Sequence, residues 1–168
     1  GAYRDAGIDA GDVDTGAVIL TGEALRRENA QAISAILSEQ GGDFVCATAG
    51  HHMEAMLAAY GSGASRVSQE SGQRILNIDI GGGTTKLALV DAGRVVATAA
   101  VHIGGRLQVV DEKGRIVRLD PAGQIHAARA GFAWTLGALT AGAPLDAIAE
   151  RMADTLIAAL SPRTMAGD

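Results

Sequence analysis

Hydrophobic residues in the first part of the chain alternate between short continuous runs and helical spacing. Apolar runs at 17–20 and 43–49 predict two buried strands. Between them, apolar positions recur every three or four residues and predict a helix over 23–39. A second helical pattern covers 52–60 and ends at glycines. This strand–helix–strand order is typical of a βαβ unit with parallel strands.

The pattern then changes to alternating apolar and polar positions, which predict β-strands. The five expected strands span 74–80, 86–90, 94–103, 106–110 and 115–119. Their tight connections, at 91–93 and 111–114, predict two hairpins. The last third of the chain is predicted to be helical, beginning its final helix near Pro144. The apolar stripe of that helix is Leu145, Ile148, Met152, Leu156 and Leu160.

The change of period falls in a polar segment, 65–73, for which we predict a loop. This segment is the best candidate for a linker or hinge. Residues 1–64 are then expected to form the end of a first lobe, and 74–168 to form a second lobe. The combination of elements predicts an α/β fold.

Composition narrows the range of partners. The net charge is −5 with a pI near 5.3, and Lys and Arg form no cluster. Nucleic acids and anionic membranes attract clustered cations, so neither is an expected partner. The longest uncharged stretch, 130–145, is short and interrupted by glycines and a proline, which argues against a membrane span. Cys46 is the single cysteine, so no internal disulfide is expected, as fits a reducing cytoplasm.

The most informative segment lies where the strand at 74–80 ends. A carboxylate in such a place needs a partner or a cation. Three glycines follow it, and glycine allows close approach of the backbone to a ligand and positive φ. Successive N–H groups of such a turn form an anion site, and two threonines and a lysine add donors. The predicted ligand-binding residues are Asp79, Gly81, Gly82, Gly83, Thr84, Thr85 and Lys86.

An ordinary glycine-rich hairpin is the simplest alternative for this loop. The preceding acid, the following threonines and the strands on both sides favour a functional loop instead. The segment is not the P-loop of NTPases, because Lys86 is followed by a strand. Lys86 either neutralises phosphate charge or faces solvent.

The segment 79–85 resembles the second phosphate loop of the superfamily of actin, heat-shock chaperones and sugar kinases. In that superfamily a β-hairpin grips the nucleotide phosphates, and a second glycine pair follows the third strand. Here that pair is Gly104 and Gly105. The resemblance implies an actin-like ATPase (ribonuclease H-like) fold that binds ATP or ADP. It also implies Mg²⁺, held by Asp79 through water.

A narrower resemblance, over residues 14 to 160, is to the ethanolamine ammonia-lyase reactivating factors. The segments that carry it are 14–23, 27–30, 42–50, Glu54 and 61–64, and it continues through 76–107. The family is larger, with another phosphate loop near its own N-terminus and an adenosine-binding segment. Neither is visible here, so we expect an internal fragment that is inactive as an ATPase by itself.

The same resemblance implies the function of the complete protein. It would use ATP and Mg²⁺ to release damaged cobalamin from ethanolamine ammonia-lyase, its partner, in the cytoplasm and in association with a microcompartment. Two alternatives on the same fold stay open: a small-molecule kinase, which needs a base for the substrate hydroxyl, and a non-catalytic scaffold chaperone.

A catalytic residue is implied only indirectly. In the chaperones a glutamate near the attacking water precedes this loop, and the register places His52 there, with Glu54 two residues on. Either Glu54 is therefore the catalytic residue, or no residue here serves that role. A zinc site formed with His51 and His52 is disfavoured, because adjacent helical side chains diverge by about 100°.

Overall fold

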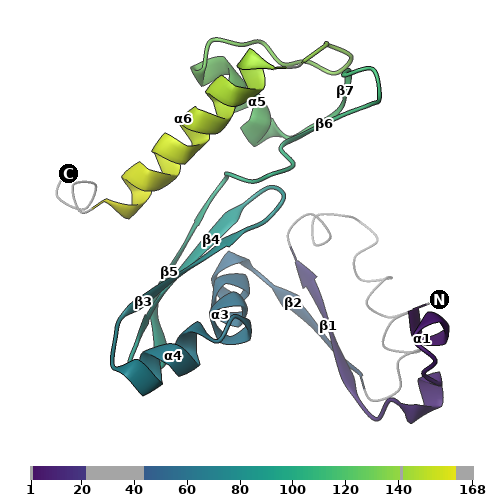
Figure 1. Ribbon diagram of the computed structural model, residues 1–168, viewed down its shortest axis with the longest axis vertical. Coiled ribbons are helices and arrows are strands. Elements are labelled where there is room, and N and C mark those ends of the chain that lie inside the picture. Colours follow the sequence, from purple (N-terminus) through teal and green to yellow (C-terminus); the bar gives the residue numbers. More distant parts are fainter. Residues whose placement is uncertain (1, 22–43, 141, 162–168) are drawn as a thin grey trace.

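The computed structural model describes residues 2–21, 44–140 and 142–161 (Figure 1). The helix predicted over 23–39 lies outside these residues. At the N-terminal end, the short helical segments α1 (Ala2–Asp5) and η1 (Ala10–Asp12) precede β1 (Gly16–Thr21). This strand pairs in parallel with β2 (Phe44–Ala49), from Gly16 opposite Phe44 to Thr21 opposite Ala49. The two strands of the predicted βαβ unit are thus confirmed, with the parallel pairing expected of them.

Two helices follow, and one of them corrects the sequence prediction. The predicted helix over 52–60 is present as α3 (His51–Gly61). The segment 65–73, predicted as a polar loop, instead forms a second helix, α4 (Ala64–Ser71). Its buried side chains are small: Ala64, Ser65 and Ser68. Small and polar buried residues give no apolar stripe in the sequence, which is why the helix was missed. The division into two lobes at this segment stays a prediction.

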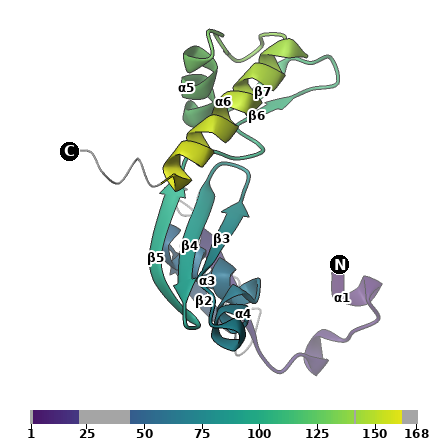
Figure 2. The ribbon, with the colours of Figure 1, turned by 60° about the vertical axis from the view of Figure 1, so that its left-hand side comes forward.

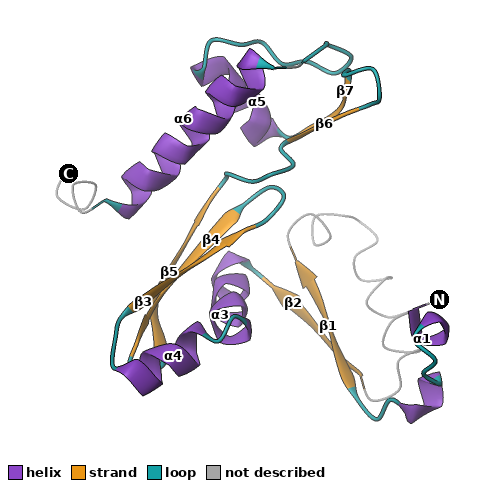
Figure 3. Ribbon diagram, viewed as in Figure 1, coloured by secondary structure: helices purple, strands orange, loops and turns teal. Residues whose placement is uncertain are grey.

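The centre of the molecule is a three-stranded antiparallel sheet (Figures 1 and 3). It consists of β3 (Ile75–Ile80), β4 (Thr85–Asp91) and β5 (Arg94–Val101), in that order. Helix α3 packs across β4 and β5, and α4 packs across β3 and β4. The residues buried between these layers are Ala55, Ala59, Ala64, Ala88 and Val90. Small side chains dominate this core, so the helices can approach the sheet closely.

The tight turn between β4 and β5 fixes how α4 sits on the sheet. Ala92 and Gly93 have φ of 48° and 79°, as in the turns preferred by two-residue hairpins. A Cβ on Gly93 would lie 3.0 Å from the Cβ of Gln69 in α4. The predicted turn at 91–93 is confirmed, and glycine is required there both by φ and by the neighbouring helix.

A second, smaller core lies beyond the sheet. The predicted hairpin is present as β6 (Gln108–Val110) and β7 (Ile116–Leu119), followed by α5 (Pro121–Arg129) and α6 (Ala143–Leu160). Asp120 caps α5 by accepting a hydrogen bond from the N–H of Ala122, 2.8 Å away. The last third is helical as predicted except over 130–140, which forms no regular element. The buried residues of this core are Ile116, Ala127, Trp134 and Ile148.

The two parts meet at the loop end of the sheet. Figure 2 shows α5, α6 and the β6–β7 hairpin above the end of β4 and β5 where the β3–β4 loop lies. Among the described helices, none combines the length and apolar character needed to cross a membrane. The arrangement places the predicted phosphate loop next to the second core.

Candidate phosphate-binding site

The predicted phosphate loop is a short connection closed by its own backbone. Strand β3 ends at Ile80 and β4 begins at Thr85, and these two residues are paired in the sheet. Within the loop, the N–H of Gly81 donates to the carbonyl of Thr84 at 3.1 Å. The antiparallel pairing thus fixes both ends of the loop, which lies at the end of the sheet where β3 passes into β4.

The following three backbone N–H groups, of Gly82, Gly83 and Thr84, form no hydrogen bond with any residue that the structure describes. All three residues line a cavity whose volume is about 650 Å³. Consecutive donors of this kind in a turn are the elements of an anion site. An anion in the cavity could therefore accept hydrogen bonds from these three backbone N–H groups.

Positive φ does not explain the three glycines of the loop, because none of Gly81, Gly82 and Gly83 has it. Steric crowding does not require all three either, since a Cβ added to Gly83 would meet nothing within 4 Å. The position where crowding does require glycine is in the second glycine pair. A Cβ on Gly104 would lie 2.6 Å from the nitrogen of Gly83 and closer still to the carbonyl oxygen of Gly82.

Hydrogen bonds join the two glycine segments directly. The N–H of Gly105 donates to the carbonyl of Gly81 at 3.0 Å, and the N–H of Arg106 donates to that of Gly82 at 2.7 Å. The structure therefore brings together glycine segments that are more than twenty residues apart in the sequence. The carbonyl groups of Gly81 and Gly82 thus accept hydrogen bonds within the protein. The N–H groups at 82–84 can donate to another partner.

The two threonines of the motif lie in different surroundings. Thr84 lines the cavity. Thr85 is fully buried, and its hydroxyl donates to the carbonyl of Ile103 at 2.9 Å. Its only hydrogen is therefore used to tie β4 to the segment before the second glycine pair. A direct bond from Thr85 to a phosphate would require that contact to break.

Asp79 lies directly across the sheet from Lys86. Its side chain is exposed, and no hydrogen bond or ion pair joins it to another residue in the described part of the chain. It does not line the 650 Å³ cavity. A carboxylate without protein partners beside a phosphate loop suits a hydrated Mg²⁺, which prefers oxygen ligands and keeps several waters.

Lys86 faces α3 and not solvent. Its ammonium nitrogen lies 2.7 Å from Oε2 of Glu54, and the two side chains are 16% and 6% exposed. His51, one helical turn before Glu54, places its Nδ1 3.6 Å from the same oxygen. Strand alternation puts Lys86 on the same face of β4 as the buried residues Ala88 and Val90, so the sequence pattern indicates that Lys86 faces the core. The sequence pattern does not indicate that its partner is Glu54 on α3.

More basic than acidic side chains line the cavity. Its cations are Lys86, Arg118 and Arg129, and its histidines are His51, His102 and His126. Asp120 is the acidic residue of the lining, and its carboxylate also caps α5. No ion pair engages Arg118 or Arg129 within the described residues. No motif marks these two residues in the sequence, because only the packing of β7 and α5 brings them to the cavity.

Histidines connect the elements around this cavity. Nε2 of His126, which is buried in α5, donates to the carbonyl of His102 at 2.9 Å. The ring of His102 meets that of His51 edge to face, with 6.1 Å between centroids. His52 turns away from its neighbour and bonds the hydroxyl of Thr98. The expected divergence of His51 and His52 is thus present, and the described residues contain no group of three candidate metal ligands.

Not all predicted residues share this cavity. The lining of the first cavity does not include Gly81, Thr85 or Glu54. Gly104 and Gly105 line a second cavity of about 290 Å³. That second cavity is largely apolar, with Trp134, Leu145 and Ile148 in its lining. The predicted residues therefore divide into those at the surface of the first cavity and those that support the loop.

The fold and the glycine loop define the class of the protein, an α/β domain with a glycine loop between two strands of an antiparallel sheet. The predicted α/β class is confirmed. The chain belongs to the family of the ethanolamine utilisation protein EutA, whose model matches residues 1–167. The predicted family resemblance is thereby confirmed as well.

Two curated relatives are similar over most of the chain. The ethanolamine ammonia-lyase reactivase EutA of Salmonella typhimurium is 43% identical over 164 residues, which are 95% of this chain and 35% of that protein. The protein of the same name from Escherichia coli K12 is 42% identical over 155 residues, 92% of this chain and 33% of that one. The chain thus spans about a third of the length of these relatives.

Similar solved structures match part of the chain. The Aquifex aeolicus member of the Ppx/GppA family has a TM-score of 0.44 and 17% identity, over 61% of this chain and 31% of its own. MreB5 of Spiroplasma citri bound to ADP has a TM-score of 0.33 and 24% identity, over 54% of this chain and 25% of its own.

Proposed function

We propose that this chain supplies one side of a nucleotide-phosphate site in an ATP-dependent factor that reactivates ethanolamine ammonia-lyase by releasing damaged cobalamin. One observation carries the proposal: the three consecutive N–H groups at 82–84 bond no described residue and belong to residues that line a cationic cavity. The names of the two relatives support the lyase as the partner.

The residues present fit a phosphate-bearing ligand. The backbone of Gly82, Gly83 and Thr84 would donate to phosphate oxygens, and Lys86 would contribute positive charge beside them. Asp79 would hold Mg²⁺ through water, and the cation would offset part of the phosphate charge when bound. The remaining predicted residues support the loop: Gly81, Thr85, Gly104 and Gly105.

The activity belongs to the whole protein in this proposal. Since the chain spans about a third of its relatives' length, we expect it to bind nucleotide weakly by itself and not to turn over ATP. A location in the cytoplasm, in association with a microcompartment, is part of the same proposal.

The hydrolytic role predicted for Glu54 stays a prediction. A general base must lie within hydrogen-bonding reach of the attacking water, whereas Oε2 of Glu54 lies 2.7 Å from the ammonium nitrogen of Lys86 and the side chain is 6% exposed. This geometry supports a role in holding Lys86.

The experiment uses the full-length protein and ethanolamine ammonia-lyase inactivated with cyanocobalamin. We expect lyase activity to return when ATP and Mg²⁺ are supplied, and not when either is omitted. A full-length protein that neither binds ATP nor restores the lyase would contradict the proposal. Transfer of phosphate from ATP to a small hydroxyl compound would favour the kinase alternative, and ATP-independent polymerisation seen by light scattering would favour the scaffold.

A further inference from the structure

The contact between Glu54 and Lys86 places two opposite charges beside the phosphate loop, away from water. The distance from the ammonium to Oε2 is 2.7 Å, and the glutamate is the more deeply buried of the two at 6% exposure. Both residues lie in regular elements, Glu54 in the first turn of α3 and Lys86 near the start of β4. The pair is therefore held by the packing of helix on sheet.

Lys86 also contacts the predicted site on its other side. It lines the same cavity as Gly82, Gly83 and Thr84. An ammonium group carries three donors, and one carboxylate oxygen at hydrogen-bonding distance uses one of them. A Cβ on Gly81 would lie 3.9 Å from the Lys86 nitrogen, so the charge sits directly against the loop backbone. Lys86 can thus bond Glu54 and a ligand at once.

We propose that Glu54 is the positioning residue of Lys86, and that its counter-charge limits how tightly the loop binds phosphate. The proposal rests on the phosphate site proposed above. An ammonium group that is largely withdrawn from water is stabilised by a negative partner. Glu54 supplies that partner, so the charge that a phosphate group meets at Lys86 is already partly compensated. The affinity of the site is then lower than it would be without the Glu54 carboxylate.

The charges predict opposite effects for the two single variants. In Glu54→Gln the amide keeps the shape and an acceptor oxygen, but Lys86 loses its counter-charge. Phosphate then becomes the main negative partner, and we expect affinity for ADP to rise on the order of tenfold. In Lys86→Met the site loses the ammonium charge while the Glu54 carboxylate stays near the loop, and we expect affinity to fall on the order of tenfold or more.

The double variant separates charge from fold. Glu54→Gln with Lys86→Met removes both charges together, which buried pairs often tolerate. Its affinity should exceed that of Lys86→Met alone by on the order of tenfold, since the repelling carboxylate is gone. This comparison holds even where Glu54→Gln alone folds poorly. Glu70→Gln is the matched control, because Glu70 is exposed on α4, outside the cavity lining.

The measurement is calorimetric titration of the full-length protein with ADP and, separately, inorganic tripolyphosphate, together with the melting temperature of each variant. A merely structural role for Glu54 would lower stability and affinity together, whereas the proposal predicts lower stability with higher affinity. Unchanged or weaker binding in Glu54→Gln, with no gain in the double variant over Lys86→Met, would overturn it. A wild-type protein that binds neither probe would overturn the phosphate site itself, and with it this inference.

Discussion

At the scale of single residues, the site depends on how closely two backbones approach. Gly104 touches the loop at Gly82 and Gly83, and hydrogen bonds from the next two residues fasten the same contact. Glycine is thus required sterically at Gly104, whereas a Cβ added to Gly83 would meet nothing within 4 Å. A sequence shows that glycine is present without showing which neighbour requires it.

Replacement of Gly104 by Ala tests this contact. A Cβ 2.6 Å from the Gly83 nitrogen forces one of the two segments to move. We expect a loss of about 1–3 kcal/mol in the free energy of unfolding, measured by urea denaturation, and a loss of nucleotide binding. Gly105→Ala is the control, because nothing lies within 4 Å of its added Cβ. Equal free energies of unfolding for the two variants would show that the loop can move away from an added Cβ without loss of stability.

At the scale of elements, the sequence predicted what is local and missed what depends on distant packing. The strands of both hairpins and α3 were predicted because alternation and helical spacing are properties of neighbouring residues. Helix α4 was missed because Ser65 and Ser68 are buried polar residues. The pair of Glu54 and Lys86 was missed because it forms only when α3 crosses β4.

Ser68 provides the test of α4 as a packed helix. Its hydroxyl is fully buried and donates to the carbonyl of Gln73 at 2.7 Å. We expect Ser68→Ala to cost about 1–2 kcal/mol in the free energy of unfolding, because that carbonyl loses its donor. Glu70→Ala, on the exposed face of the same helix, should change stability by less than about 0.5 kcal/mol. A flexible linker in this place would make both variants neutral.

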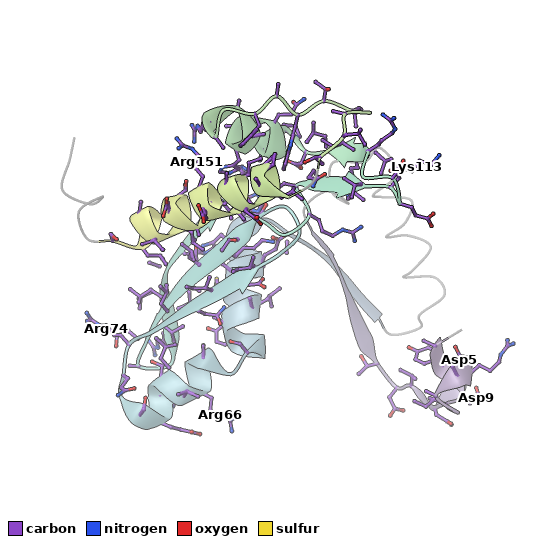
Figure 4. The ribbon with its side chains drawn as sticks, turned by 45° about the horizontal axis from the view of Figure 1, so that its top comes forward. Asp5, Asp9, Arg66, Arg74, Lys113 and Arg151 are labelled. Carbon is purple, nitrogen blue, oxygen red and sulfur yellow. The ribbon has the colours of Figure 1, made fainter. Side chains whose placement is uncertain are left out.

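At the scale of the whole molecule, the cavity lies where the sheet meets the second core. Side chains from α3, β4, β5, β7, α5 and α6 contribute to its lining. Basic residues elsewhere are dispersed: Figure 4 shows Arg66 and Arg74 near α4, Lys113 on the β6–β7 hairpin and Arg151 on α6. The cavity thus concentrates positive charge in a protein whose net charge is −5.

The cationic lining predicts a contribution from Arg118 to ligand affinity. Arg118 lines the cavity and has no ion-pair partner among the described residues. We expect Arg118→Ala to weaken ADP binding by about threefold to tenfold in calorimetry, with little effect on the melting temperature. Lys113→Ala, in the turn of the same hairpin, should leave the affinity unchanged. Equal effects of the two variants would indicate a general influence of charge and no specific role of the cavity.

Amide NMR tests most directly whether the loop N–H groups bind phosphate. In the full-length protein, addition of ADP with Mg²⁺ should shift the amide signals of Gly82, Gly83 and Thr84 and slow their hydrogen exchange. The amide of Gly114, which already donates to the carbonyl of Asp111 in the distant hairpin turn, should not change. Saturating nucleotide that leaves the three loop amides unaltered would contradict the account.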